Sequence, residues 1–110
     1  MTYENRKHIR VFLPVAITLK IDNRIIRGSQ CQNISLGGMF VLTREEITEN
    51  EEGSVALTVK CGKTFQNFQA GFRVVWTDPA KQYGAGISFN DIDSNNLLSL
   101  ENIIHHQMLV

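Results

Sequence analysis

Two short motifs in this sequence bring together residue types that recognise nucleotides. Arg6 and Arg10 stand four positions apart in the N-terminal segment, and Asn33, Ser35 and Gly38 form the pattern NxSxxG. A guanidinium is a planar fork of donors that pairs with two phosphate oxygens or with the O6 and N7 acceptors of guanine, and it also stacks on a purine face. An Asn amide offers a donor and an acceptor to a base edge, and a Ser hydroxyl offers a further hydrogen bond.

Four neighbouring residues extend this candidate binding site. Gly37 and Gly38 let the backbone approach a ligand closely. Lys7 and His8 lie between the two arginines and are additional candidate ligand contacts, although a His in a polar segment is more often simply solvated. An RxxxR spacing alone is typical of a solvated pair, and an NxSxxG segment alone is typical of a hairpin turn. The two motifs together, in this order, are a more specific signal.

The same residues indicate binding rather than catalysis. Ser35 has neither the GxSxG context of a nucleophile nor an evident His–acid partner. His105 and His106 are adjacent and therefore point to different faces of a helix, which disfavours a metal site. The acidic residues near position 93 lack the Gly and Glu that a calcium loop requires. We therefore expect no catalytic residue, no metal and no cofactor.

Hydrophobic periodicity predicts the elements that must position these motifs. Period-two alternation predicts strands over residues 11–21, 55–59, 68–76 and 85–89, each with one buried face. Residues 24–34 are a plausible second strand in which Gly28 marks a bend or bulge, and 39–42 is a short apolar run after the glycine turn. Trp76 and the phenylalanines are accordingly expected in the core. Apolar residues recur at helical spacing near the end of the chain, and Asp93 or Ser94 can cap a helix over 94–108. The fold class is therefore mostly β, an antiparallel barrel or sandwich with a C-terminal helix.

The composition is that of one globular domain. The chain has 110 residues, of which 43% are hydrophobic, and its 11 basic and 11 acidic residues give zero net charge. A neutral chain argues against long duplex nucleic acid or an anionic membrane as partner. The first ten residues have little apolar surface to bury, so we predict a flexible basic arm over 1–10 and a single domain over 11–110.

The cysteines and the hydropathy indicate the compartment. Cys31 and Cys61 form no CxxC motif and have no His at metal-ligand spacing, so we expect neither a disulfide framework nor a zinc site. Two unpaired cysteines are typical of a protein in a reducing environment. No apolar run reaches the length of a secretory or membrane-spanning segment. We therefore expect a cytoplasmic protein with no membrane insertion.

The order of the two motifs resembles the PilZ domain family. The family signature places RxxxR before the first strand and (D/N)xSxxG after the second, and here it reads Arg6, Arg10, Asn33, Ser35 and Gly38. The segments VVW at 74–76 and YGAGISF at 83–89 resemble the closing strands of the family, so the resemblance covers essentially the whole chain. It implies a bacterial protein with a six-stranded antiparallel β-barrel and a C-terminal helix, whose ligand is the second messenger cyclic di-GMP.

The polar composition of the arm leads to a prediction of how such a receptor works. The arm that carries Arg6 and Arg10 would change conformation when cyclic di-GMP binds, and an unidentified protein effector would read that change. An additional Arg directly before the motif is typical of members that bind two stacked ligand molecules. Asn5 stands at that position here, which favours one molecule. Leu98 and Ile103 of the expected helix are candidate exposed residues for the effector to contact.

Two other classes of function remain open. A protein-interaction module without a ligand would have the same fold. A small nucleic-acid-binding barrel would need exposed aromatic platforms beside a basic groove. The neutral charge and the expected burial of the aromatic residues disfavour that alternative.

Overall fold

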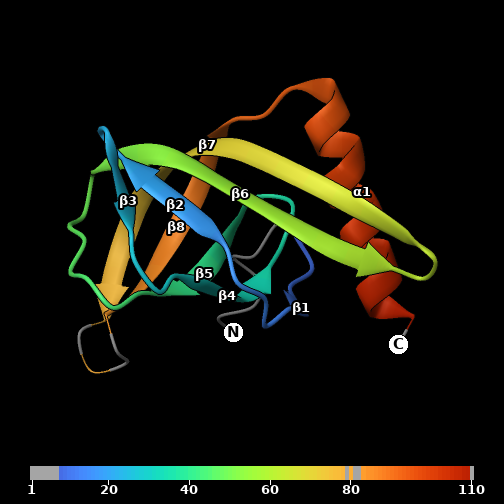
Figure 1. Cartoon of the computed structure of the whole chain (residues 1–110), viewed down its shortest axis with the longest axis horizontal. Helices are drawn as coiled ribbons and strands as arrows, with labels where there is room; N and C mark the ends of the chain where they lie inside the picture. The colour runs from blue at the N-terminus through green and yellow to red at the C-terminus, as the bar shows by residue number, and fades with distance from the viewer. Residues whose placement is uncertain (1–7, 79, 81–82, 110) are drawn as a thin grey trace.

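The computed structural model describes residues 8–78, 80 and 83–109, and within them the chain forms one antiparallel sheet and one helix (Figure 1). The sheet order is β1-β4-β5-β8-β7-β6-β2-β3. The strands are β1 (Val11–Phe12), β2 (Thr18–Ile21), β3 (Arg24–Ile26), β4 (Gln30–Ile34), β5 (Gly38–Leu42), β6 (Glu52–Cys61), β7 (Thr64–Asp78) and β8 (Gly84–Asp91). The helix α1 (Ser94–Met108) packs mainly against β7 and also contacts β1 and β6.

The mostly β fold and the C-terminal helix are confirmed, but the closed six-stranded barrel is wrong. The sheet is open and has eight strands, because each of the first two expected strands is interrupted. Pro14 has no N–H to donate to a ladder, and the N–H of Val15 bonds instead to the carbonyl of Leu13 at 2.9 Å, which separates β1 from β2. Gly28, with a φ of 65°, separates β3 from β4.

The segment between β1 and β2 is hydrogen-bonded to β4 and to the residue just before it. The N–H of Cys31 donates to the carbonyl of Val15 at 2.8 Å, and the N–H of Ile17 donates to the carbonyl of Ser29 at 3.1 Å. The chain therefore runs beside β4 before β2 turns to pair with β6. As a result, the residues just before β1 are held beside the end of β4, where the NxSxxG motif begins.

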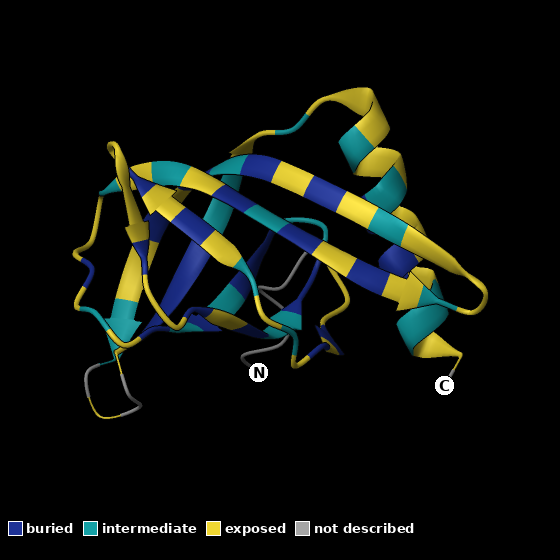
Figure 2. Ribbon diagram, in the orientation of Figure 1, coloured by how far each residue is buried: buried dark blue, intermediate teal, exposed yellow. Residues whose placement is uncertain are grey.

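One face of the sheet is buried, as the alternation predicts. Buried and exposed residues alternate along β6 and β7 (Figure 2). Phe68 and Phe72 are among the largest fully buried side chains. The ring of Phe68 packs edge-on against the ring of Phe89, with their centroids 5.3 Å apart. The expectation that every Phe and the single Trp lie in the core is wrong, since the exposed aromatic residues include Phe12, Phe65 and Trp76.

Helix α1 is tied to the sheet at both ends. The carboxylate of Asp93 caps its N-terminus by accepting from the N–H of Asn96 at 2.8 Å, which also lowers the pKa of Asp93. The side-chain oxygen of Asn96 in turn accepts from the N–H of Gln69 in β7 at 2.8 Å. In the last turn, the amide of Gln107 donates to the carbonyl of Phe12 in β1 at 3.0 Å. The buried face between these anchors consists of Leu100, Ile103 and Ile104.

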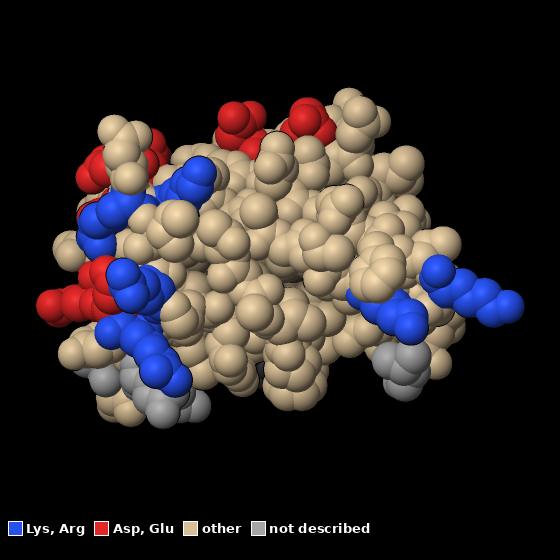
Figure 3. All heavy atoms as spheres, viewed as in Figure 1, with Lys and Arg blue, Asp and Glu red and all other residues tan. Residues whose placement is uncertain are grey.

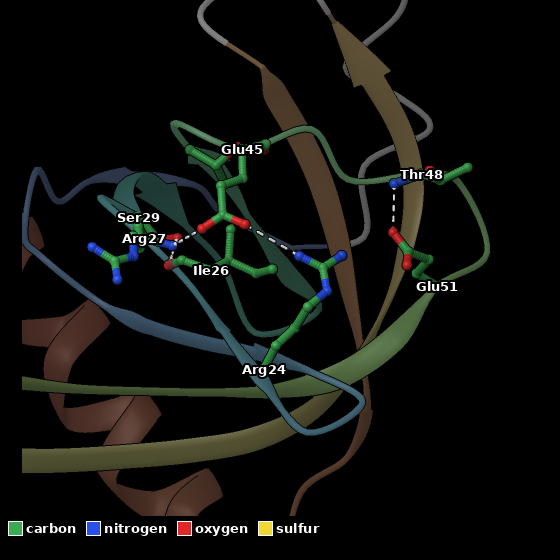
Figure 4. A network of polar contacts seen from close by, with 8 residues as sticks. Arg24, Ile26, Arg27, Ser29, Glu45, Thr48 and Glu51 are labelled. Atoms are coloured by element: carbon green, nitrogen blue, oxygen red, sulfur yellow. Dashed lines mark hydrogen bonds and ion pairs between the residues drawn. The ribbon is translucent and has the colours of Figure 1, made fainter.

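The acidic connection between β5 and β6 is fastened to the break between β3 and β4. Glu45 accepts from the guanidinium of Arg24 at 3.2 Å and from the backbone N–H of Arg27 at 2.8 Å (Figure 4). Farther along, Glu51 accepts from the N–H of Thr48 at 2.7 Å. Glu45 thus satisfies a backbone donor just after the edge strand β3, whereas Glu51 satisfies one within the connection itself.

Two substitutions in β7 test the assignment of inner and outer positions. Phe72 is 0% exposed and Phe65 is 65% exposed. Phe72→Ala should lower the free energy of unfolding by about 3–5 kcal/mol because it leaves a cavity in the core. The matched variant Phe65→Ala should stay within about 0.5 kcal/mol of the natural chain. Urea denaturation followed by circular dichroism measures both, and equal losses would contradict the fold.

Candidate functional site

Five cross-strand partners form a row on the outer face of the sheet. Phe12 in β1 pairs with Asn33 in β4, and Asn33 pairs with Phe40 in β5. Phe40 pairs with Gly86 in β8, and Gly86 pairs with Trp76 in β7. Since neighbouring strands lie about 4.8 Å apart, directly paired residues are adjacent on the surface. The row therefore joins the two sequence motifs to an aromatic surface on β5 and β7.

Arg10 and Asn33 are brought together as the two motifs predict. The guanidinium Nη1 of Arg10 donates to the side-chain oxygen of Asn33 at 3.0 Å. This contact follows from the β1–β4 pairing, because Arg10 directly precedes β1. His8 lies beside the turn, where a Cβ built on Gly37 would be 3.0 Å from the imidazole Cδ2. Arg6 and Lys7, with the rest of the arm before His8, lie outside the described residues.

Ser35 and Gly38 have roles within the turn itself. The N–H of Ser35 donates to the carbonyl of Gly38 at 2.8 Å, and its buried hydroxyl accepts from the N–H of Gly37 at 3.2 Å. A Cβ on Gly38 would lie 2.1 Å from the carbonyl oxygen of Ile87, so only glycine permits β5 to approach β8 this closely. The serine and this glycine shape the turn that presents Asn33.

A hollow of about 640 Å³ lies over the row, within the usual range for small-molecule sites. It is lined by Arg10, Val11, Phe12, Gln32, Asn33, Phe40, Trp76 and Asp78. Two further hollows of about 630 and 600 Å³ lie over β2, β6 and β7, and neither has an arginine in its lining. The hollow over the row is thus the one that combines a guanidinium, an amide and exposed aromatic rings.

The aromatic side of this hollow is the part that the sequence analysis missed. The rings of Phe40 and Trp76 are stacked, with their centroids 5.3 Å apart and their planes 15° from parallel. Trp76 is 42% exposed and Val75 is 48% exposed, because a bulge shifts the register between Val74 and Trp76. A second bulge shifts the register between Cys31 and Asn33. Bulges re-aim side chains beside functional sites, and here both adjoin the hollow.

Cys31 lies beneath this surface and has no exposed area. Its thiol donates to the carbonyl of Asn33 at 3.4 Å. Burial raises the pKa of Cys31 to about 12, because the thiolate would lose its hydration. The pKa of Cys61, at the end of the β6–β7 hairpin, is also raised by burial. The thiol of Cys31 therefore stays protonated and has a packing role at neutral pH.

The described part of the chain offers neither a metal site nor a membrane-spanning helix. Across residues 8–78, 80 and 83–109, no group of three or more His, Cys, Asp and Glu side chains is placed to hold a metal ion. The same residues contain no helix that is long and apolar enough to span a membrane.

Comparisons with known proteins agree with the family resemblance and with the fold. The family model of the PilZ domain matches residues 4–106. The inhibitor of motility from Bacillus subtilis (MotI/DgrA) has a similar structure, with a TM-score of 0.74 and 14% sequence identity. That similarity covers 96% of this chain and 51% of the inhibitor, so the chain spans about half of the length of this structural relative. No curated protein matches the chain in sequence.

Substitutions in the NxSxxG motif should separate its structural residues from the residue that faces the hollow. Ser35→Ala should lower the free energy of unfolding by about 0.5–1.5 kcal/mol, because the buried turn loses a hydrogen bond. Asn33→Ala should change it by less than about 0.5 kcal/mol, because its bond to Arg10 is exposed. Thermal unfolding measures both, and a larger loss for Asn33→Ala would contradict this division.

Thiol chemistry should distinguish the two cysteines. In the folded chain at neutral pH, iodoacetamide should modify Cys61 well before Cys31, because the Cys31 thiol is buried and its pKa is about 12. Both thiols should react in denaturant. Peptide mass spectrometry after timed labelling identifies each site, and early modification of Cys31 would show that the sheet beneath the hollow opens.

Proposed function

The chain belongs to the PilZ domain family, a family of cyclic di-GMP receptors, and we propose that it binds cyclic di-GMP in the hollow over the Phe12–Trp76 row. One observation carries this proposal. Arg10, Asn33 and the stacked Phe40–Trp76 pair surround the same hollow. The two arginines and the three motif positions that the family resemblance requires are all present in the sequence.

Each part of the hollow offers a contact that suits a cyclic guanine dinucleotide. The guanidinium of Arg10 pairs with a phosphate or with the O6 and N7 edge of guanine. The amide of Asn33 is already oriented by its bond to Arg10 and meets a base edge. The exposed face of Trp76 offers a surface on which a base stacks. These groups bind and orient a ligand, and their arrangement supports a receptor rather than an enzyme.

We propose that Arg6 supplies a second guanidinium. The arm would close over the ligand, with His8 and Lys7 as further contacts, and one ligand molecule would bind per chain. The described end of the arm supports this arrangement, because His8 adjoins Gly37 and Arg10 adjoins Asn33. Ordering the arm would reduce the net affinity, so we expect a dissociation constant on the order of micromolar.

We propose that a protein effector reads the bound state near the arm and helix α1. The bond from Gln107 to the carbonyl of Phe12 links the end of the helix to the strand that follows Arg10. Leu98 is 58% exposed and remains a candidate docking residue. Ile103 is fully buried, so its expected exposure is wrong. The helix thus has an exposed position for a partner on the side away from the sheet.

A single-stranded nucleic acid is the second candidate ligand, because the exposed ring of Trp76, stacked on Phe40, supplies the aromatic platform that the sequence analysis did not expect. The charges around the hollow do not favour it, because the described lining holds one cation, Arg10, and one carboxylate, Asp78. Figure 3 shows the face over β2, β6 and β7, where Lys and Arg side chains gather at the two ends and the middle carries none. A nucleic-acid backbone requires a continuous basic groove, and the described part of that face, which lies over other strands than those that carry Asn33 and Phe40, forms none.

Isothermal titration with cyclic di-GMP tests the proposed function. We expect saturable binding with one ligand per chain and no comparable heat from GMP, cyclic di-AMP or a short oligonucleotide. Arg10→Ala should weaken binding about ten- to a hundredfold, since a charge-assisted hydrogen bond contributes about 1.5–3 kcal/mol. Arg10→Lys should restore little of the loss, because an ammonium lacks the planar fork.

Arg73→Ala is the matched control. Arg73 is an exposed arginine of β7 whose guanidinium lies 3.4 Å from Glu52, and it does not line the hollow. Its loss should leave the affinity unchanged. No heat with cyclic di-GMP would reject the receptor and leave a protein-interaction module. Equal loss in Arg10→Ala and Arg73→Ala would place the ligand elsewhere.

A further inference from the structure

We infer that Gly86 and Phe40 are positioning residues that hold the indole of Trp76 as the aromatic wall of the ligand site. This inference rests on the proposed function and assigns roles within the same hollow. Neither residue belongs to the RxxxR or NxSxxG motif. Phe40 lines the hollow, whereas Gly86 is buried beneath the aromatic pair and can act on a ligand only through Trp76.

The bulge in β7 is the first feature that turns Trp76 outward. Val74 pairs with Ile87 and is fully buried, and strict alternation would place Trp76 on the same inner face. The next cross-strand pair is instead Trp76 with Gly86, so Val75 is the extra residue. The inserted residue moves Trp76 to the outer face, where its ring can cross β8.

The missing side chain of Gly86 is the second feature. A Cβ at this position would lie 2.1 Å from Nε1, 2.5 Å from Cε2 and 2.7 Å from Cδ1 of Trp76. All three atoms belong to the rigid indole ring, so a single methyl group could be accommodated only if the whole ring moved. The indole therefore occupies the space that any other side chain at position 86 would fill.

The position of Gly86 also lets Trp76 and Phe40 meet. Phe40 and Trp76 lie on the strands to either side of β8, and both have Gly86 as their cross-strand partner. Two strand spacings separate their backbones by about 9.6 Å, yet their ring centroids are only 5.3 Å apart. Both rings lean over Gly86 and stack there. Phe40 thus supports one face of the indole and fixes the direction in which the ring faces the hollow.

A fixed ring should bind a base more tightly than a mobile one. Stacking needs the indole in one orientation, and a ring that must be ordered when the ligand arrives loses conformational entropy at that step. Gly86→Ala should therefore weaken binding of cyclic di-GMP as much as Trp76→Ala does, roughly five- to a hundredfold. Phe40→Leu, which removes the stacked ring but keeps an apolar side chain, should give a smaller loss.

The sole tryptophan makes the position of this ring directly measurable. The chain contains one Trp, so its intrinsic fluorescence reports Trp76 alone. Without ligand, Gly86→Ala and Phe40→Leu should shift the emission to longer wavelength, because the displaced indole gains contact with water. Gly71→Ala is the matched control, a glycine of β7 whose added Cβ would meet Asn90 and Asp91 at 3.0 Å and would not touch Trp76. It should leave the emission unchanged.

Titration of the double variant separates positioning from direct contact. If Gly86 acts through Trp76, then Gly86→Ala combined with Trp76→Ala should bind no more weakly than Trp76→Ala alone. Additive losses, or an unshifted emission in a folded Gly86→Ala chain, would overturn the inference. If the natural chain does not bind cyclic di-GMP, the proposed function fails, and the ligand-free emission spectra still decide whether Gly86 and Phe40 position the ring.

Discussion

The close approach of three strands at β8 is the constraint on which the candidate site depends. β8 lies between β5 and β7, and it can carry the stacked Phe40–Trp76 pair only because Gly86 has no side chain. The first pair of the β5–β8 ladder has a similar requirement, since a Cβ on Gly38 would meet the carbonyl of Ile87. Glycine weakens a strand through its backbone entropy, so two such positions in one pair of strands indicate that close packing outweighs that cost.

The NxSxxG motif divides into a structural part and a part that faces the hollow. Ser35 accepts a hydrogen bond from a backbone N–H of the turn, and Gly38 permits the close contact with β8. Both roles would be needed whether or not a ligand binds. Asn33 is different, because it lines the hollow and accepts from Arg10. A motif that accompanies ligand binding can therefore include residues whose contribution is the shape of the backbone.

The sequence was sufficient to predict the elements that follow a regular hydrophobic pattern. It was insufficient to predict the breaks and bulges that interrupt this pattern. Helix α1 has the predicted bounds, 94–108, and its N-cap is Asp93, one of the two predicted candidates, because helical spacing and a capping residue are local signals. Pro14 and Gly28 are also local signals, and a stricter reading of Pro14 would have divided the first strand. The bulges at Gln32 and Val75 have no such signature, because they arise from how two strands fit together. The exposure of Trp76, and with it the aromatic side of the hollow, was therefore missed.

The arrangement of the row suggests that affinity and ligand identity come from different strands. Stacking on the Phe40–Trp76 side tolerates any base, because every base has a flat face. Hydrogen-bonding groups discriminate more strongly, because a ligand that lacks the matching group leaves them unpaired. Arg10 and Asn33 are the groups of this kind that the two sequence motifs bring to the hollow. On the proposed function, guanine would therefore be selected at β1 and β4, while β5, β7 and Gly86 would supply binding energy that any purine could use.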